Sequence, residues 1–253
     1  MKIFTNYNWL HFYYASQFEY YNNEEYGECL CKSYKLHPFE DQIASTNSLV
    51  FDPKKAAALY FWYKSADRSN DCIIEFFEEY KKCIDETHKQ FNSNYGYYAY
   101  KCYGLQRCID TLIKNKNSRQ ACFCINNNSA MSPRSIDKLC TNTIQFFIRN
   151  DELIMLVQMR SSNLLTMLPY DFFTFCIWYA QVYNKLIQTY PELKVNYINV
   201  QVASLHYYRS DYVKKDVITA PSNNLTHLFG YKEVCDKNFE KILEEKLAKF
   251  LNN

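Results

Sequence analysis

Two apolar runs rich in β-forming residues stand on either side of a short polar turn, and this arrangement constrains the fold most. The runs are TIQFFI at 143–148 and ELIMLVQM at 152–159, with polar residues at 149–151 between them. Adjacent β-rich runs joined by a polar turn predict an antiparallel hairpin. An apolar run at 171–189 follows, and its length predicts a long helix.

The first clear helix signal comes earlier, at Asp52 and Pro53. Asp is a favourable N-cap and Pro is tolerated in a first turn, so we expect a helix over 53–65. The remaining predicted elements are helices at 72–89, 103–114 and 238–251 and strands at 121–125 and 196–202. Helices mixed with antiparallel strands indicate an α+β fold, a mixed β-sheet with packed helices.

The chain has 253 residues, of which 48% are hydrophobic, enough to bury one substantial core. Residues 1–40 form a Tyr-rich N-terminal lead without a clear period, and we leave their structure unassigned. Residues 41–253 are predicted to form a single domain.

Charge and hydropathy restrict the class of partner. Lys and Arg number 29 against 27 Asp and Glu, and a net charge of +2 provides no broad field for a polyanion. The aromatic N-terminus is broken by polar residues and lacks the apolar core of a signal peptide. The run from Tyr170 to Tyr183 is too short to span a bilayer. We therefore expect a soluble cytoplasmic protein that binds neither nucleic acid nor membrane, with any phosphate recognition local.

Eleven cysteines are present, and the odd count in a large chain favours reduced thiols over a disulfide framework. Two Cys-x-Cys pairs, Cys29/Cys31 and Cys122/Cys124, could in principle supply four thiolates to zinc. The second pair alternates within a predicted strand, so we expect no metal site.

Four segments occur in an order and spacing that resemble a known family. They are LCTNTIQFFIR at 139–149, MRS at 159–161, PYD at 169–171 and ASLHYY at 203–208. Cys140 precedes Arg160 by 20 positions, and Asp171 follows Arg160 by 11. The chain resembles the thymidylate synthase and deoxycytidylate (dCMP) hydroxymethylase family, most closely its T-even phage branch.

The resemblance is strongest over roughly residues 92–212, and FWYKS at 61–65 adds to it. It implies a thymidylate-synthase-like fold and a homodimer. It also implies transfer of a one-carbon unit from 5,10-methylenetetrahydrofolate to carbon 5 of a pyrimidine deoxynucleoside monophosphate.

Cys140 is expected to be the nucleophile, because in this family a thiolate adds to carbon 6 of the ring and activates carbon 5. Arg160 matches an arginine near both thiol and phosphate, and a neighbouring cation lowers a thiol pKa. Tyr95 matches a tyrosine near the thiol. The alternative is that Cys140 is one of several buried thiols without a catalytic role.

Arg160 and Ser161 match the pair that holds the phosphate, and a planar guanidinium beside a hydroxyl suits a phosphate monoester. Arg119 resembles an arginine that reaches the phosphate of the neighbouring subunit. The second arginine expected there is Gln120. That replacement removes a charge-assisted contact of about 1.5–3 kcal/mol and weakens the case for a shared-site dimer.

Asp171 is expected to read the base. The family carries Asn at this position for uridylate and Asp for cytidylate, and a carboxyl group can pair with the cytosine amino group and ring nitrogen. The alternative is an N-cap for the helix that begins there. His206 and Tyr208 match residues that bind the sugar hydroxyl, and Asn142 and Ser204 are weaker candidates for the base pocket.

Besides Gln120, three positions depart from the family. Leu59 replaces a glutamate that organises proton transfer, and leucine can do neither acid nor base chemistry. Asn163 replaces an aspartate that meets the folate, and Met167 replaces a small glycine beside it. These changes leave two alternatives to dCMP hydroxymethylation: methylation of dUMP, or a diverged nucleotide-binding protein without catalysis.

Overall fold

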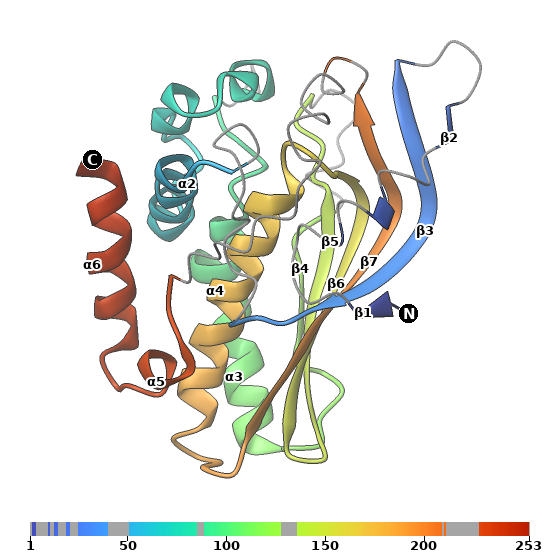
Figure 1. The fold of residues 1–253 in the computed structure, drawn as a ribbon. Coiled ribbons are helices and arrows are strands. Elements are labelled where there is room, and N and C mark those ends of the chain that lie inside the picture. Colours follow the sequence, from blue (N-terminus) through green and yellow to red (C-terminus); the bar gives the residue numbers. More distant parts are fainter. Residues whose placement is uncertain are drawn as a thin grey trace.

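A mixed β-sheet lies against layers of helices in the computed structural model (Figure 1). The structure describes residues 2–3, 10, 13–14, 19–20, 25–39, 51–84, 89–127, 136–208, 210 and 228–252. The strands run in the order β1-β3-β7-β6-β5-β4, and β2 pairs with β3. The predicted α+β class, with a mixed sheet and packed helices, is confirmed.

The elements have the following bounds. The strands are β1 (Lys2–Ile3), β2 (Glu19–Tyr20), β3 (Tyr26–Leu36), β4 (Cys122–Cys124), β5 (Thr141–Arg149), β6 (Glu152–Asn163) and β7 (Lys194–Tyr208). The helices are α2 (Pro53–Ser65), α3 (Gly104–Lys114), α4 (Leu168–Leu186), α5 (Tyr231–Val234) and α6 (Phe239–Asn252). Two short 3-10 helices, η1 (Cys72–Glu75) and η2 (Glu78–Cys83), and a π-helix, η3 (Tyr97–Lys101), complete the set.

The predicted hairpin is confirmed as β5 and β6, which pair antiparallel from Arg149 opposite Glu152. Asn150 and Asp151 form the turn with positive φ angles of 52° and 57°. Two successive left-handed residues are typical of a type I′ turn, whose twist matches that of the strands. The next strand of the sheet, β7, pairs parallel with β6, and α4 makes the crossover between them.

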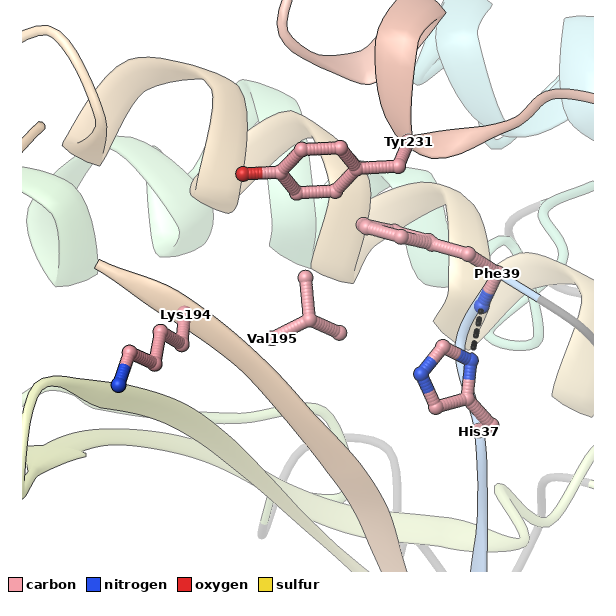
Figure 2. Close-up of a pocket in the computed structure, with 5 residues that line it drawn as sticks. All are labelled: His37, Phe39, Lys194, Val195 and Tyr231. Atoms are coloured by element: carbon pink, nitrogen blue, oxygen red, sulfur yellow. Dashed lines mark hydrogen bonds between the residues drawn. The ribbon is translucent and has the colours of Figure 1, made fainter. Parts of the chain in front are cut away.

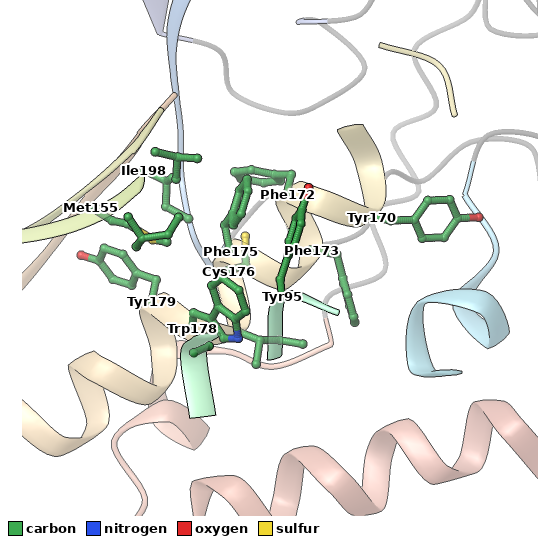
Figure 3. Close-up of a cluster of buried hydrophobic side chains, with 14 of the residues drawn as sticks. Tyr95, Met155, Tyr170, Phe172, Phe173, Phe175, Cys176, Trp178, Tyr179 and Ile198 are labelled. Atoms are coloured by element: carbon green, nitrogen blue, oxygen red, sulfur yellow. The ribbon is translucent and has the colours of Figure 1, made fainter. Parts of the chain in front are cut away.

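Helix α4 is the centre of the core. Every residue of α4 except Lys185 is buried, because the sheet covers one side and α2, α3 and α6 cover others. Figure 3 shows its aromatic side chains packed together and against Met155 and Ile198 of the sheet. A helix that is apolar all round is stable only inside such a layer. None of the described helices is long and apolar enough to cross a membrane.

The predicted start of α2 is confirmed, since Asp52 Oδ1 accepts a hydrogen bond from Lys54 N at 2.8 Å. The helices predicted at 103–114 and 238–251 and the strands at 121–125 and 196–202 are also present, with shifted bounds. The single helix predicted at 72–89 is wrong. The chain forms η1 and η2 instead, separated at Phe77 by extended backbone with φ −130° and ψ 89°.

Strand β3 lies within residues 1–40, whose structure the sequence left unassigned. It pairs antiparallel with β7 over nearly its whole length, from Tyr26 opposite Tyr208 to Leu36 opposite Ile198. This lead therefore contributes a long strand beside β7, flanked on its other side by the two-residue strand β1.

Four neighbouring strands change their buried face along one line across the sheet. In each, the alternation of buried and exposed side chains is interrupted by successive residues that are not buried. These are the four residues 30–33 in β3 and the pairs 203–204 in β7, 160–161 in β6 and 142–143 in β5. Cys31 has a positive φ of 53°, and the β5–β6 register shifts between Thr141 and Thr143. Such irregularities re-aim side chains, and this line of face changes carries Arg160 and Ser161.

Candidate functional site

Cys140 and Arg160 are in contact at the line of face changes. Arg160 Nη2 lies 3.8 Å from Cys140 Sγ. The guanidinium is held there by two backbone carbonyls, with Nε donating to Leu139 O and Nη2 to Lys138 O, both at 2.8 Å. The pairing of thiol and guanidinium predicted from the sequence is therefore present, and the chain around the cysteine fixes its geometry.

Tyr95 positions the backbone that carries the thiol. Its hydroxyl oxygen accepts hydrogen bonds from Cys140 N at 3.3 Å and Thr141 N at 3.4 Å. The ring is buried and stacks on Tyr63 of α2, with centroids 5.6 Å apart. Tyr95 thus lies near the thiol, as the sequence predicts, and it contacts the main chain beside the sulfur.

Arg160 lowers the pKa of Cys140, as expected, but the net pKa of the thiol is raised. Burial is the largest cause and raises the pKa to about 11, while Arg160 acts in the opposite direction. The negative charges of Asp171 and Asp137 raise it further. Burial destabilises the thiolate more than the positive charge of Arg160 stabilises it. The thiol is therefore protonated at neutral pH in the ligand-free protein.

Asp171 lies in the first turn of α4 and is only 5% exposed. The N-cap of this helix is Met167, so the alternative that Asp171 caps the helix is wrong. Among the described residues, none donates a hydrogen bond to its carboxylate, and burial raises the pKa of Asp171 to about 7. Its charge raises the pKa of Cys140 and, after burial, that of Tyr80. We call Cys140, Arg160, Tyr95 and Asp171 the thiol cluster.

Ser161 belongs to a second group of side chains, around a cavity of about 220 Å³ that we call the serine–histidine cavity. Ser161 Oγ lies 3.2 Å from His206 Nδ1. Ser204 Oγ donates a hydrogen bond to Glu28. Glu28 of β3 lies opposite His206 of β7 in the strand register. The cavity is lined by Tyr26, Glu28, Ser161, Ser204, His206 and Tyr208.

The two groups meet where the alternation of β6 is interrupted. Leu205 and Tyr207, which alternate with the residues of the serine–histidine cavity, are buried in the core, and Asp171 of α4 is buried as well. In a regular strand Arg160 and Ser161 would point in opposite directions. Here neither is buried, and Arg160 contacts the thiol cluster while Ser161 contacts the cavity. Their shared peptide bond joins the two groups.

Asn142 and Arg119 lie outside both groups. Asn142 Oδ1 accepts a hydrogen bond from Asn126 Nδ2 at 3.0 Å, and Asn142 lines a shallow hollow on the outer face of the sheet. Arg119 is exposed, and its carbonyl accepts a hydrogen bond from Gln145 Nε2 at 2.9 Å. One subunit therefore does not bring either residue to Cys140.

Leu59, Asn163 and Met167, where the sequence departs from the pattern of the family that it resembles, make structural contacts. Leu59 is fully buried in α2. Asn163 Oδ1 accepts hydrogen bonds from Leu165 N at 2.9 Å and Thr166 N at 3.1 Å, which builds the turn into α4. Met167 is the N-cap residue of α4 and packs against the core. Asn163, expected on the cofactor side, uses its acceptor oxygen within the chain.

Sequence reasoning missed Tyr26, Glu28 and Asp137. The first two lie in the unassigned lead, where no local pattern marked a strand. Asp137 is buried, and one of its carboxylate oxygens accepts a hydrogen bond from Ser93 N at 2.7 Å. Burial raises the pKa of Asp137 as well. An aspartate three positions before Cys140 was the only available signal.

The two Cys-x-Cys pairs lie on β3 and β4, which are separated in the sheet by β7, β6 and β5. Strands are spaced by about 4.8 Å, so the pairs are too far apart to share a metal ion.

No protein-family model matches this chain, and no curated protein matches its sequence. Its function is therefore inferred from the contacts, burial and charge of these residues.

Proposed function

We propose that this chain binds a pyrimidine deoxynucleoside monophosphate, dCMP in preference to dUMP, and adds the Cys140 sulfur to carbon 6 of its ring. The observation that carries the proposal is the guanidinium of Arg160, 3.8 Å from Cys140 Sγ, on the residue that precedes Ser161 in the chain. A cation beside a thiol, with a hydroxyl on the next residue, suits a ligand that has a reactive ring and a phosphate.

The choice of cytosine follows from Asp171. A pKa of about 7 makes protonated and ionised forms both accessible at neutral pH. The protonated carboxyl group donates to the cytosine ring nitrogen and accepts from its amino group. Uracil presents a ring N–H and a carbonyl oxygen instead, so a carboxyl proton held on the oxygen that faces the ring nitrogen would meet a like partner. A mismatched buried pair lowers binding of the wrong base by orders of magnitude.

The base would lie on the thiol-cluster side, and the sugar would lie in the serine–histidine cavity against His206 and Tyr208. The phosphate would then lie at the line of face changes, near Arg160 and Ser161. Arg119 could contribute only from a second subunit, so a homodimer with a thymidylate-synthase-like fold belongs to the proposal.

The proposed step begins with transfer of the Cys140 proton to water. The sulfur then forms a bond to carbon 6 as the double bond between carbons 5 and 6 opens, and carbon 5 gains a proton from water. Reversal of these steps exchanges the hydrogen on carbon 5. Protonation of Asp171 against cytosine removes one negative charge that raises the thiol pKa, so binding of cytosine assists formation of the thiolate.

The expected donor, 5,10-methylenetetrahydrofolate, fits the described residues poorly. Asn163 commits its acceptor oxygen to a turn, and Met167 occupies the start of α4. We therefore derive no step through folate. Buried Leu59 and the raised pKa of Cys140 favour a second candidate, a nucleotide-binding protein that has lost catalysis.

Purified protein titrated with dCMP and with dUMP, each with and without methylenetetrahydrofolate, tests the proposal. Release of tritium from carbon 5 of dCMP measures addition of the thiol. We expect release with dCMP, its loss in Cys140→Ser, and no change in Cys102→Ser, which alters an exposed thiol. Tight binding of dCMP without tritium release favours the second candidate, and absence of binding rejects both.

A further inference from the structure

A cavity of about 420 Å³ lies at the other end of the sheet, where β3 ends and β7 begins (Figure 2). It is lined by His37, Phe39, Lys194, Val195 and Tyr231. Lys194 and His206 lie 12 residues apart on β7, which corresponds to about 40 Å at about 3.3 Å per residue. This cavity is therefore separate from the proposed nucleotide site, and its volume falls within the usual range for small ligands.

Two aromatic rings of this cavity are fixed in place. Phe39 is buried and packs edge-on against Tyr179 and Tyr183 of α4. Tyr231 is 54% exposed, yet its hydroxyl oxygen lies 3.2 Å from that of Tyr183. The contact between the two hydroxyl groups restricts rotation of the exposed Tyr231 side chain. Its apolar face is available to a ligand at little cost in ordering.

The hydrogen-bonding roles of two side chains follow from their partners. Tyr183 donates its hydroxyl proton to Leu193 O at 2.7 Å, so Tyr231 is the donor between the two hydroxyls. The Tyr231 oxygen can then only accept a hydrogen bond from a ligand. His37 Nδ1 accepts from Phe39 N at 3.2 Å, so the neutral ring carries its proton on Nε2.

Lys194 supplies a positive charge, and the nearby carboxylates have other partners. Glu152 lies opposite Lys194 in the sheet but accepts a hydrogen bond from Asn196 Nδ2 at 2.5 Å. Asp151 and Glu192 both pair with Lys116 at 2.6 Å. Within the described parts of the chain, Lys194 forms no ion pair, and no acidic residue lines the cavity.

We propose that this cavity binds a small planar aromatic anion, a ring that carries a phosphate or carboxylate group, with the anionic group at Lys194. The centroids of Phe39 and Tyr231 are 6.5 Å apart, which is contact distance for two rings. The ligand ring therefore rests against this pair and does not insert between its members. Figure 2 shows Val195 between the lysine and the two rings. Val195 lines the cavity there, and the proposed ligand would lie over its apolar side chain.

Phenyl phosphate is the first probe. Its binding to the full chain is measured at low salt by ligand-observed NMR titration. We expect saturable binding that weakens about tenfold or more in Lys194→Met and by several-fold in Tyr231→Ala. Lys114→Met, which removes an exposed lysine of α3, is the matched control and leaves the affinity unchanged. Benzoate tests the carboxylate arm.

Inorganic phosphate and benzyl alcohol separate the two parts of the proposed ligand, and each alone is expected to bind at least tenfold more weakly than phenyl phosphate. Equal affinity for inorganic phosphate, or an unchanged affinity in Lys194→Met, overturns the proposal, as does absence of phenyl phosphate binding. Asp171→Asn is expected to leave this binding unchanged, which distinguishes the cavity from the proposed nucleotide site.

Discussion

The thiol cluster and the serine–histidine cavity are joined by one peptide bond, yet they differ in how much water reaches their polar groups. Asp171 is 5% exposed and Tyr208 is 47% exposed. In the thiol cluster, burial shifts the pKa of Cys140 to about 11 and that of Asp171 to about 7. In the cavity, hydroxyl, imidazole and carboxylate groups hydrogen-bond to one another at the surface. In the function we propose, the first region changes the reactivity of the ligand and the second holds it.

The largest expected effect comes from Asp171→Asn. The folded-state pKa of about 7 exceeds the ordinary value of 3.8, so the folded protein binds more protons than the unfolded chain between about pH 4 and 7. Stability of the wild-type protein therefore falls as pH rises through this window. Asn removes the cost, and Asp171→Asn should be more stable at pH 8 by up to about 4 kcal/mol.

Urea denaturation at pH 5 and pH 8 measures this difference, with exposed Asp110→Asn as the matched control. The same variant should lose its preference for dCMP over dUMP. A wild-type protein whose stability is flat from pH 4 to 7 would contradict the burial of an ionisable Asp171.

Tyr95→Phe is the next largest effect. It leaves the N–H groups of Cys140 and Thr141 without their acceptor, at a cost of about 2 kcal/mol in the free energy of unfolding. Urea denaturation measures the loss, and Tyr103→Phe, at an exposed ring, should change stability by less than about 0.5 kcal/mol. Equal stability of the two variants would mean that Tyr95 does not hold the thiol backbone.

His206→Ala tests the serine–histidine cavity. We expect dCMP affinity to fall about tenfold with little change in unfolding free energy, because the side chain lies at a surface cavity and its loss removes about one hydrogen bond. Calorimetric titration with dCMP measures the loss, and Gln201→Ala, on the same strand, gives the baseline. A large loss of stability would show that His206 is a structural residue.

The smallest effect is expected from Glu28→Gln. Removing the Glu28 carboxylate removes its repulsion of the phosphate, so dCMP should bind about two- to threefold more tightly at low ionic strength. The effect is small because solvent and salt screen charges at the surface. The gain should disappear at about 1 M salt, where the Debye length is about 3 Å. Weaker binding at low salt would indicate that Glu28 accepts a hydrogen bond from the ligand.

Local signals predicted the elements that local interactions determine. Asp52 and Pro53 mark the start of α2, and the polar turn marks the hairpin, because caps and turns act within a few residues. The prediction of one helix at 72–89 was wrong because a local pattern of buried residues does not distinguish one long helix from two short ones. Ile73, Phe77 and Tyr80 are all buried at helical spacing, but two 3-10 helices separated at Phe77 bury the same side chains.

Strand β3 was missed because the alternation that identifies a strand is interrupted within it. Gly27 and Cys29 are buried before the interruption, and Tyr34 and Leu36 after it. A period of two that changes phase at Cys31 gives no clear signal in a single sequence.

The spacing of Cys140, Arg160 and Asp171 predicted which residues meet in the thiol cluster. It could not predict their protonation, because burial depends on tyrosines from α2 and η2, far away in the sequence. Nor could it show that Arg160 and Ser161 lie where the alternation of four strands is interrupted, since the faces of a strand are known only once its neighbours are placed.

The line of face changes crosses four strands that each keep their core side chains inward on both sides of it. A single-residue deletion next to this line, in one strand alone, would turn half of that strand inside out while its neighbours kept their phase. Such a deletion would move buried rings into water at a cost far above that of an ordinary loop change. Length variation among relatives of this chain should therefore be confined to the turns, and the four strands should gain or lose residues together or not at all.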